Sequence, residues 1–242
     1  MSALLELRNV TKSFRGLRAV ANANFEVPAD GIVALIGPNG AGKTTLFNLI
    51  AGVFAPDSGE IYFNDRRIDG LRADQVCATG IGRTFQLVKP FAGMSVLDNV
   101  IVGALHRASS VDQARRHAET ILAALGLGAK RDHPAQSLTL PERKRLELAR
   151  ALATRPKLLL LDEVLAGLRP TECDELITTL REINQQEGIA IVLIEHVMRA
   201  VMALAHKVVV LHHGEVIAQG TPAEVVRDPA VVESYLGEVA TI

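Results

Sequence analysis

Residues 37–44 constrain this chain more than any other stretch of its sequence. They read Gly37, Pro38, Asn39, Gly40, Ala41, Gly42, Lys43 and Thr44, which matches the G-x-x-x-x-G-K-[ST] pattern of a phosphate-binding loop. The apolar, β-branched run at 31–36 precedes the loop and is typical of a buried strand. Residues 45–50 follow it and place their leucines and isoleucine on one face of a helix. The pattern therefore stands between a strand and a helix, which is the context that it needs.

Each residue type in this loop has a chemical reason. Glycines let the backbone pass close to phosphates, so that its N–H groups point at them. The N-terminus of the following helix adds partial positive charge. Lys43 is expected to reach the β- and γ-phosphates, Thr44 to ligand Mg²⁺, and Thr45 to complete the nucleotide-binding set. The alternative is a glycine-rich turn that binds nothing, but the flanking strand and helix favour the phosphate loop.

The composition excludes several classes of protein. A chain of 242 residues suits one large domain or two small ones. A net charge of -1 offers no basic excess for nucleic acid, so no nucleic-acid partner is expected. Two cysteines form no disulfide framework and favour a reduced, cytosolic compartment. The longest apolar runs are too short to span a bilayer, and the N-terminus carries charge where a secretory signal is apolar. We therefore expect a soluble protein that meets a membrane through a partner.

A second strong signal lies at 157–163, where an apolar strand ends in Asp162 and Glu163. A Mg²⁺ ion held by the loop threonine needs a second anchor, which a strand-terminal aspartate supplies. This strand should lie parallel beside the strand at 31–36, so that their carboxyl ends converge on one crevice. A carboxylate just past the metal ligand can polarise an attacking water. The alternative is a strand that ends at a solvated acidic turn.

Three further residues are weaker candidates when each is taken alone. Gln86 could ligand a metal or hold a water with its amide, and it could equally be solvated. His196 follows the apolar strand at 189–194, at the same end as the phosphate loop, although a lone histidine is more often a satisfied polar group. Phe14 could stack on a nucleotide base or plug the edge of a sheet, and its spacing alone favours the packing role.

The remaining pattern predicts an α/β architecture. Strands are expected at 5–10, 23–28 and 60–64, with a turn at 11–16. Strand signals vanish over about 92–155, where helical periodicity takes over. This block is therefore predicted to be a helical subdomain that is inserted into an α/β core.

Two helices and a hairpin complete the predicted elements. Within the helical block, Pro141 fits the first position of a helix, and Thr139 or Leu140 lies near its cap. Thr139 is chemically the better cap. After the paired carboxylates, a charged amphipathic helix is predicted over 171–187 and a hairpin over 207–218.

The order of these motifs resembles the ATP-binding subunit of an ABC transporter over nearly the whole chain. Residues 37–44 look like the Walker A loop of that family, and Gln86 looks like its Q-loop glutamine. Residues 158–162 followed by Glu163 resemble Walker B and the catalytic glutamate, and His196 looks like the switch histidine. The resemblance therefore implies ATP and Mg²⁺ as cofactors.

The same resemblance implies the fold and one more contact. It predicts a P-loop NTPase (RecA-like) core with an antiparallel β subdomain and an inserted helical subdomain. A single ABC ATPase domain is expected over 4–237, with its core at 4–86 and 156–237 and the helical subdomain at about 92–155. Phe14 takes the place of the aromatic residue that stacks on adenine, which reverses the packing interpretation above.

Finer matches resemble the importers of branched-chain amino acids, and the first of that system's two ATPase subunits. They lie at 82–86, 193–196, 220–224 and 234–238. Importers of urea or short amides share much of this pattern and stay an alternative. A soluble ABC ATPase that acts on nucleic acid is a third possibility, but the chain has neither a second ATPase unit nor a long coiled-coil insertion. An inactive regulatory subunit conflicts with the intact loop lysine and the paired carboxylates.

Two departures from the family pattern bear on function. The family signature reads Leu-Ser-Gly-Gly-Gln, whereas the matching positions here are Leu138, Thr139, Leu140, Pro141 and Glu142. Both glycines are missing, which predicts that the site completed by this segment is weakened. Val164 stands where a proline usually follows the catalytic glutamate, and this change is expected to act locally.

The resemblance also implies a mechanism in which two ATPase chains face each other head to tail. Mg²⁺ would be held by Thr44, Asp162 and Gln86, while Glu163 polarises water and His196 stabilises charge on the phosphoryl group. The altered signature predicts a heterodimer with a sister ATPase that carries the consensus signature.

Membrane partners follow from the same family pattern. A groove near Gln86, Pro90, Phe91 and Met94 is predicted to receive a helix of the transmembrane permease subunits. A periplasmic or extracellular binding protein would act indirectly. The expected location is peripheral, at the cytoplasmic face of the plasma (inner) membrane.

Overall fold

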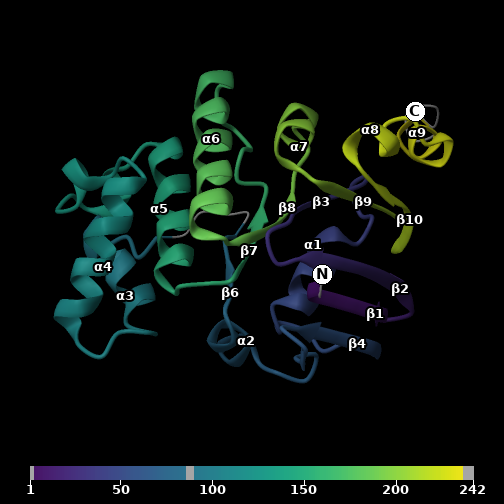
Figure 1. Cartoon of the computed structure of the whole chain (residues 1–242), viewed down its shortest axis with the longest axis horizontal. Coiled ribbons are helices and arrows are strands. Elements are labelled where there is room, and N and C mark those ends of the chain that lie inside the picture. Colours follow the sequence, from purple (N-terminus) through teal and green to yellow (C-terminus); the bar gives the residue numbers. More distant parts are fainter. Residues whose placement is uncertain (1–2, 86–89, 237–242) are drawn as a thin grey trace.

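Two β-sheets organise the chain, which the computed structural model describes at residues 3–85 and 90–236 (Figure 1). The strands are β1 (Ala3–Phe14), β2 (Leu17–Pro28), β3 (Ile32–Ile36), β4 (Ser58–Phe63), β5 (Arg66–Arg67), β6 (Ile81–Arg83), β7 (Leu158–Asp162), β8 (Ala190–Ile194), β9 (Lys207–His212) and β10 (Glu215–Gly220). The α-helices are α1 (Lys43–Ile50), α2 (Ala73–Thr79), α3 (Val96–Ala104), α4 (Val111–Ala124), α5 (Leu140–Ala153), α6 (Pro170–Glu187), α7 (Met198–Leu204), α8 (Pro222–Val225) and α9 (Pro229–Leu236). Short 3₁₀ turns lie at Gly128–Lys130 and Ala135–Ser137.

The larger sheet has the strand order β10-β9-β3-β8-β7-β6 and is parallel except for the β9–β10 hairpin. Every residue of β3, β7 and β8 is buried, as expected for parallel strands that are covered on both faces. Alternate residues of β3 point to opposite faces, with Val33 and Leu35 in one apolar cluster and Ala34 and Ile36 in the other. The carboxyl ends of these strands meet at one edge of the sheet.

The smaller sheet is antiparallel, in the order β2-β1-β4-β5, and it corrects one prediction. The turn predicted at 11–16 is too long: β1 continues to Phe14 and β2 begins at Leu17, so the turn is confined to Arg15 and Gly16. Two contacts to Asp57 hold the polar end of β1, one from the Lys12 ammonium and one from the Ser13 N–H, each at 2.7 Å. Cross-strand pairing and these contacts keep polar residues in a strand that their local sequence does not favour.

Helices α3, α4 and α5 pack on one another at one side of the molecule, beside α6 (Figure 1). They follow β6 and precede β7 in the chain, within the block predicted to be helical. Ser95 and Ser110 cap α3 and α4 by accepting hydrogen bonds from backbone N–H groups in the first turn of each helix. The two sheets and this helical group bear out the predicted α/β fold class.

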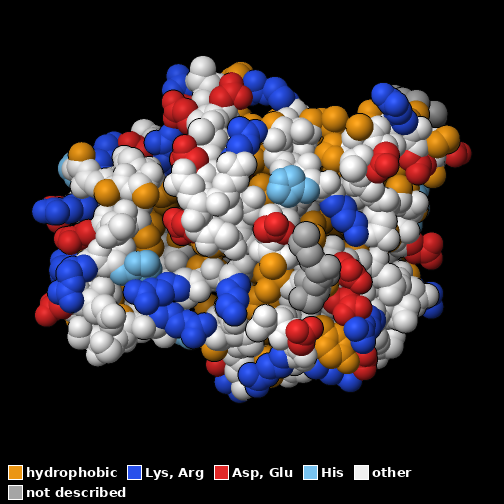
Figure 2. All heavy atoms as spheres, viewed as in Figure 1, with side chains coloured by type: hydrophobic (Ala, Val, Ile, Leu, Met, Phe, Trp, Pro, Cys, Tyr) orange, Lys and Arg blue, Asp and Glu red, His pale blue; other side chains and the backbone are white. Residues whose placement is uncertain are grey.

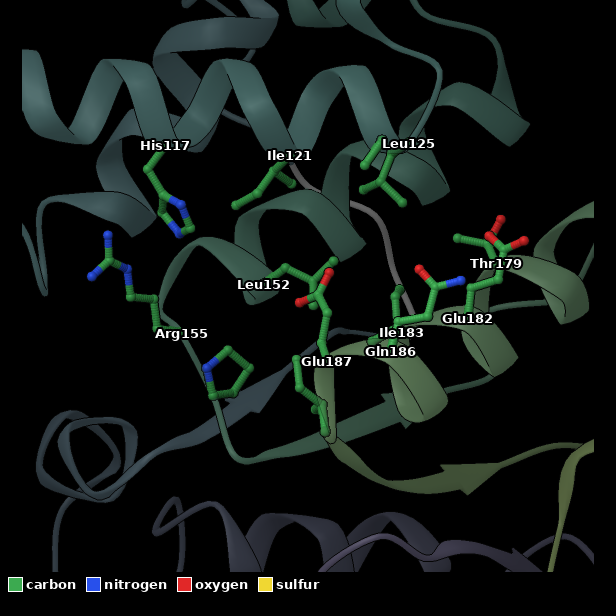
Figure 3. A pocket seen from close by; sticks show the side chains of 13 residues that line it. His117, Ile121, Leu125, Leu152, Arg155, Thr179, Glu182, Ile183, Gln186 and Glu187 are labelled. Carbon is green, nitrogen blue, oxygen red and sulfur yellow. The ribbon is translucent and has the colours of Figure 1, made fainter.

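A cavity of about 280 Å³ lies between α4, α5 and α6, where the helical group meets the rest of the chain (Figure 3). His117 and Arg155 lie on one side of it, while Glu182 and Gln186 lie across from them. The residues that line this cavity include none of the predicted site residues. The cavity is therefore separate from the chemistry described below.

The surface and the helix lengths agree with the composition. Acidic and basic side chains are interspersed over the face shown in Figure 2, in keeping with the net charge of -1. Among residues 3–85 and 90–236, no helix combines the length and apolar character that crossing a membrane requires.

Candidate active site

The phosphate-loop sequence connects β3 to α1, and close packing explains two of its glycines. Gly37 has a φ of +147°, and a Cβ there would lie 2.0 Å from the carbonyl oxygen of Leu211. Gly42 has a φ of +104°, and a Cβ there would lie 2.2 Å from the carbonyl oxygen of Ala19. Because both positions combine positive φ with backbone contact, only glycine fits them without distortion.

Lys43 is the first residue of α1, and its side chain turns back over the loop. The ammonium donates to the carbonyl oxygens of Gly37, at 2.6 Å, and Pro38, at 2.8 Å. The apolar residues of α1 are buried beneath the loop, as predicted. The positive charge and the N-terminal N–H groups of the helix thus lie at one place, which suits an anionic phosphate.

Asp162 ends β7 at the same edge of the sheet and is only 2% exposed. Its Oδ1 atom is buried and finds no hydrogen-bond partner among the residues that the structure describes. Oδ2 lies 3.5 Å from a guanidinium nitrogen of Arg83. Burial raises the pKa of the Asp162 carboxyl, against the opposing effect of the Arg83 charge. An unsatisfied buried carboxylate oxygen fits a hard cation such as Mg²⁺, which prefers oxygen ligands.

Glu163 and His196 are 33 positions apart in sequence and meet in the structure. His196 Nε2 lies 3.2 Å from Glu163 Oε1, which accepts the hydrogen bond when the carboxylate is ionised. The Glu163 N–H donates to the carbonyl oxygen of Ile194, the last residue of β8, at 2.9 Å. Glu163 has a φ of +51°, a conformation that non-glycine residues rarely adopt and that concentrates at functional sites.

Three buried charged residues lie near this pair, and the sequence patterns did not predict any of them to be a site residue. Glu147 accepts a hydrogen bond from the Phe85 N–H at 3.0 Å, and Glu195 accepts one from the Leu165 N–H at 2.9 Å. Burial raises the pKa of both carboxyls, that of Glu195 to about 7. Lys144 donates to the carbonyl oxygen of Glu163.

A signal for Lys144 was present in the sequence of α5. Lys144, Leu148 and Ala151 recur at helical spacing and are all buried in the structure. A charge within such an apolar stripe is a marker of buried polar chemistry. Recognising it requires knowing that this face of α5 turns inward.

The segment 138–142 surrounds the start of α5. Thr139 is the N-cap, as predicted, and its N–H donates a hydrogen bond to Glu142 Oε2 at 2.9 Å. Lys130 pairs with the other oxygen of Glu142 at 2.5 Å, and this contact lowers the pKa of the Glu142 carboxyl. The Glu142 charge is thus engaged within its own chain, whereas the Leu140 side chain is exposed.

Phe14 and Gln86 are the remaining predicted site residues. The ring of Phe14 stands at the end of the β1–β2 hairpin, is 38% exposed, and packs edge-on against Phe54 with centroids 5.2 Å apart. Phe14 therefore does not belong to a buried sheet edge. Gln86 lies outside the described residues.

The parallel sheet, the glycine loop before α1 and the aspartate at the end of β7 together define a P-loop NTPase. The ABC transporter family model matches residues 20–166, and the model for the branched-chain amino acid ATP-binding cassette transporter matches residues 215–241. The chain belongs to the ABC transporter family of ATP-binding proteins, and it is an ATPase subunit of that family.

Individual relatives support this assignment. The chain is 37% identical to the high-affinity branched-chain amino acid transport ATP-binding protein LivG of Escherichia coli strain K12, over 97% of this chain and 98% of LivG. It is 35% identical to the lipopolysaccharide export system ATP-binding protein LptB of the same strain, over 98% of each chain. A solved ATP-binding cassette of an ABC transporter in its ADP conformation superposes with a TM-score of 0.89, at 30% identity, over 98% of this chain and all of that one.

Proposed function

We propose that this chain hydrolyses MgATP to power a membrane importer of branched-chain amino acids. The observation that carries the hydrolytic part is the contact between Glu163 and His196 beside the unsatisfied oxygen of Asp162. The match at residues 215–241 and the similarity to LivG support the substrate class. Sequence identity over the whole chain does not by itself distinguish an amino-acid importer from a lipopolysaccharide exporter, because LptB is almost as similar as LivG.

The phosphate loop supplies nucleotide binding in this proposal. Backbone N–H groups at 37–45 surround the phosphates, and Lys43 exchanges its carbonyl contacts for the β- and γ-phosphate oxygens. Thr44, Asp162 and Gln86 would hold Mg²⁺, which would supply positive charge beside the phosphates. Phe14 is exposed enough to offer its ring to the base.

The chain's own side chains then handle the attacking water. Glu163 orients the water and accepts its proton as the water oxygen attacks the γ-phosphorus. The bond from that phosphorus to the β–γ bridging oxygen breaks, and the products are ADP and phosphate. His196 holds the Glu163 carboxylate in place at 3.2 Å before the reaction, and its N–H turns from that carboxylate to the transferring phosphoryl oxygen as the phosphate separates.

The signature segment supports a heterodimer with a sister ATPase. Thr139 keeps a hydroxyl, but Leu140 adds an exposed side chain where close backbone approach is wanted, and Pro141 has no N–H to donate. Because Glu142 is engaged by Lys130 and by the helix start, its charge contributes less to this weakening than the backbone changes do. A sister chain with the consensus signature would complete the site built on Lys43 and Glu163.

An apolar cavity supports docking to the permease subunits. It has a volume of about 280 Å³ and lies between α2, β6, α3 and α5. Phe85 and Arg150 form part of its wall, and the Arg150 guanidinium lies 4.6 Å from the ring centroid of Phe91. The described residues that line the cavity do not include Pro90, Phe91 or Met94, so it adjoins the predicted groove and does not coincide with it. A permease helix in this groove would place the chain peripherally at the cytoplasmic face of the membrane, with a periplasmic or extracellular binding protein acting indirectly.

Transport by the reconstituted complex tests the substrate and the energy source together. Proteoliposomes that contain the co-purified permease, with its binding protein, should accumulate labelled leucine only when ATP is present. Lys43→Ala should stop that uptake, because the loop loses its phosphate-binding cation. Uptake of urea in place of leucine, or leucine uptake that is unchanged by Lys43→Ala, would contradict the proposal.

A further inference from the structure

Lys144 is a buried cation that joins two functional segments of the chain. It lies in the first half of α5, is 6% exposed, and donates from Nζ to the carbonyl oxygen of Glu163 at 2.9 Å. The same helix begins at Thr139, in the segment that resembles the signature. One end of α5 therefore faces a partner chain in the proposed dimer, and this lysine contacts the residue proposed to act on water.

Residues 163–166 form a short segment after β7, which we name the catalytic loop. Besides the bond from Lys144, the Glu163 N–H donates to Ile194 O at 2.9 Å, and the Leu165 N–H donates to Glu195 Oε1 at 2.9 Å. The Ala166 N–H donates to Glu163 O at 3.2 Å. A positive φ at a non-glycine residue persists only where its surroundings hold it, and these bonds surround Glu163.

The bond from Lys144 differs from the others in its origin. The other three come from β8, from the residue after β8 and from the catalytic loop itself, whereas Lys144 belongs to the helical group α3–α5. A displacement of α5 therefore changes the position of the Glu163 carbonyl through this contact, while the bonds to Ile194 and Glu195 hold the loop to β8 and the residue after it. Since Lys144 donates to a backbone carbonyl, the contact acts on peptide orientation directly.

A buried ammonium is costly unless its surroundings compensate it. Here the lysine charge acts on three buried carboxyls, those of Glu147, Asp162 and Glu195, and lowers the pKa of each against the upward effect of burial. An apolar side chain of similar length would fill the same space without that cost. The packing of α5 alone therefore does not explain a lysine at this position.

We propose that Lys144 is a positioning residue that links the signature end of α5 to the backbone of Glu163. Binding of the partner chain's ATP at the start of α5 then changes the orientation of Glu163 in this chain, and each site senses the occupancy of the other. The inference rests on the roles proposed above for Glu163 and for the signature segment.

Lys144→Met in the assembled transporter tests this link, with Arg145→Met as the matched control. Arg145 is the next residue of α5 and pairs with Glu175 at the surface, so its replacement also removes a cation from the helix. For Lys144→Met we expect turnover to fall about tenfold or more, while nucleotide affinity stays within about twofold. Amide hydrogen exchange in the catalytic loop should become about tenfold faster, with exchange in α1 unchanged. Lys144→Arg keeps the charge and the donor and should recover part of the turnover.

Several outcomes overturn the proposal. Near-normal turnover in Lys144→Met, an equal loss in Arg145→Met, or a loss of turnover without faster exchange in the catalytic loop would each do so. If Lys144→Met does not assemble, Lys144→Gln replaces it under the same expectations, because its shorter side chain does not span the distance. Failure of the proposed function gives a different pattern: Glu163→Gln would leave turnover intact, whereas hydrogen exchange would still report the contact from Lys144.

Discussion

The phosphate loop and the catalytic loop lie at the same sheet edge and are built in opposite ways. Residues 37–44 are contiguous, and their function depends on backbone N–H groups and on glycines that fit against neighbouring backbone. The catalytic loop at 163–166 takes its shape from side chains and carbonyls on α5, β8 and the residue after β8. In the proposed mechanism, nucleotide binding therefore depends on one contiguous stretch of sequence, whereas hydrolysis depends on how separate elements are held together.

Replacing Glu163, the proposed general base, should have the largest effect. It also distinguishes most clearly between the phosphate loop, which binds nucleotide, and the catalytic loop, which acts in hydrolysis. Glu163→Gln should lower steady-state ATP hydrolysis about 10²–10⁴-fold, because the amide keeps the shape but cannot accept a proton. Nucleotide affinity should be unchanged, since the phosphate loop is intact. Turnover near the wild-type rate in the purified complex would remove Glu163 from this role.

The same substitution also tests the asymmetry of the proposed heterodimer. Its equivalent in the sister chain should cost less turnover, because that chain's site is completed by the altered signature at 138–142. Equal effects of the two mutations would contradict the asymmetry, as would full ATPase activity of this chain alone.

Adding a methyl group at Gly42 of the phosphate loop should strongly weaken nucleotide binding. Gly42→Ala should destabilise the loop by roughly 4 kcal/mol, because the backbone is left-handed there and the new Cβ would lie within 2.2 Å of Ala19 O. Gly40→Ala is the matched control: its φ is also positive, at +78°, but no atom lies within 4 Å of the added Cβ. It should cost only about 1 kcal/mol. Calorimetric titration with nucleotide checks both, and equal losses would show that close packing is not the cause.

The buried carboxyl of Glu195 should make stability depend on pH. Burial raises its pKa to about 7 in the folded protein, above the value of 4.5 expected for an unfolded chain. Between these values the unfolded chain releases the proton that the folded protein keeps, so stability falls as pH rises and levels off above about pH 7. The total loss should be about 3 kcal/mol.

Glu195→Gln supplies the comparison for that pH dependence. The amide oxygen can still accept from the Leu165 N–H but does not titrate. Urea unfolding at a series of pH values should therefore show the variant gaining stability relative to wild type from about pH 4.5 to 7. Parallel curves for the two proteins would show that this carboxyl does not hold its proton on folding.

The smallest expected effect concerns the contact between Phe14 and the adenine or guanine ring of the nucleotide. Phe14→Ala should weaken ATP and GTP binding alike, by about 1–3 kcal/mol of lost stacking, because a ring face does not read base edges. Nucleotide titration by calorimetry measures this, with hydrolysis at saturating ATP expected to stay near wild type. Unchanged affinity would assign Phe14 to its contact with Phe54 alone.

The amino-acid sequence predicts the phosphate loop, the strand-terminal Asp162 and Glu163, and the cap at Thr139 without reference to the structure. Each of these depends on neighbours within a few positions, so a local pattern is sufficient to predict it. The α/β class follows in the same way from periodicity along single elements.

The tertiary structure alone decided the rest. It brought His196 to Glu163, extended β1 into the predicted turn as far as Phe14, and buried Lys144 and Glu195 around the catalytic loop. Strand pairing and burial depend on residues far away in the chain, which periodicity along one element does not report. A charged side chain on a helix has little effect on the rest of the protein when it faces water, but it can position a functional residue when it faces the backbone of that residue. The packing of the helix decides which way the side chain faces.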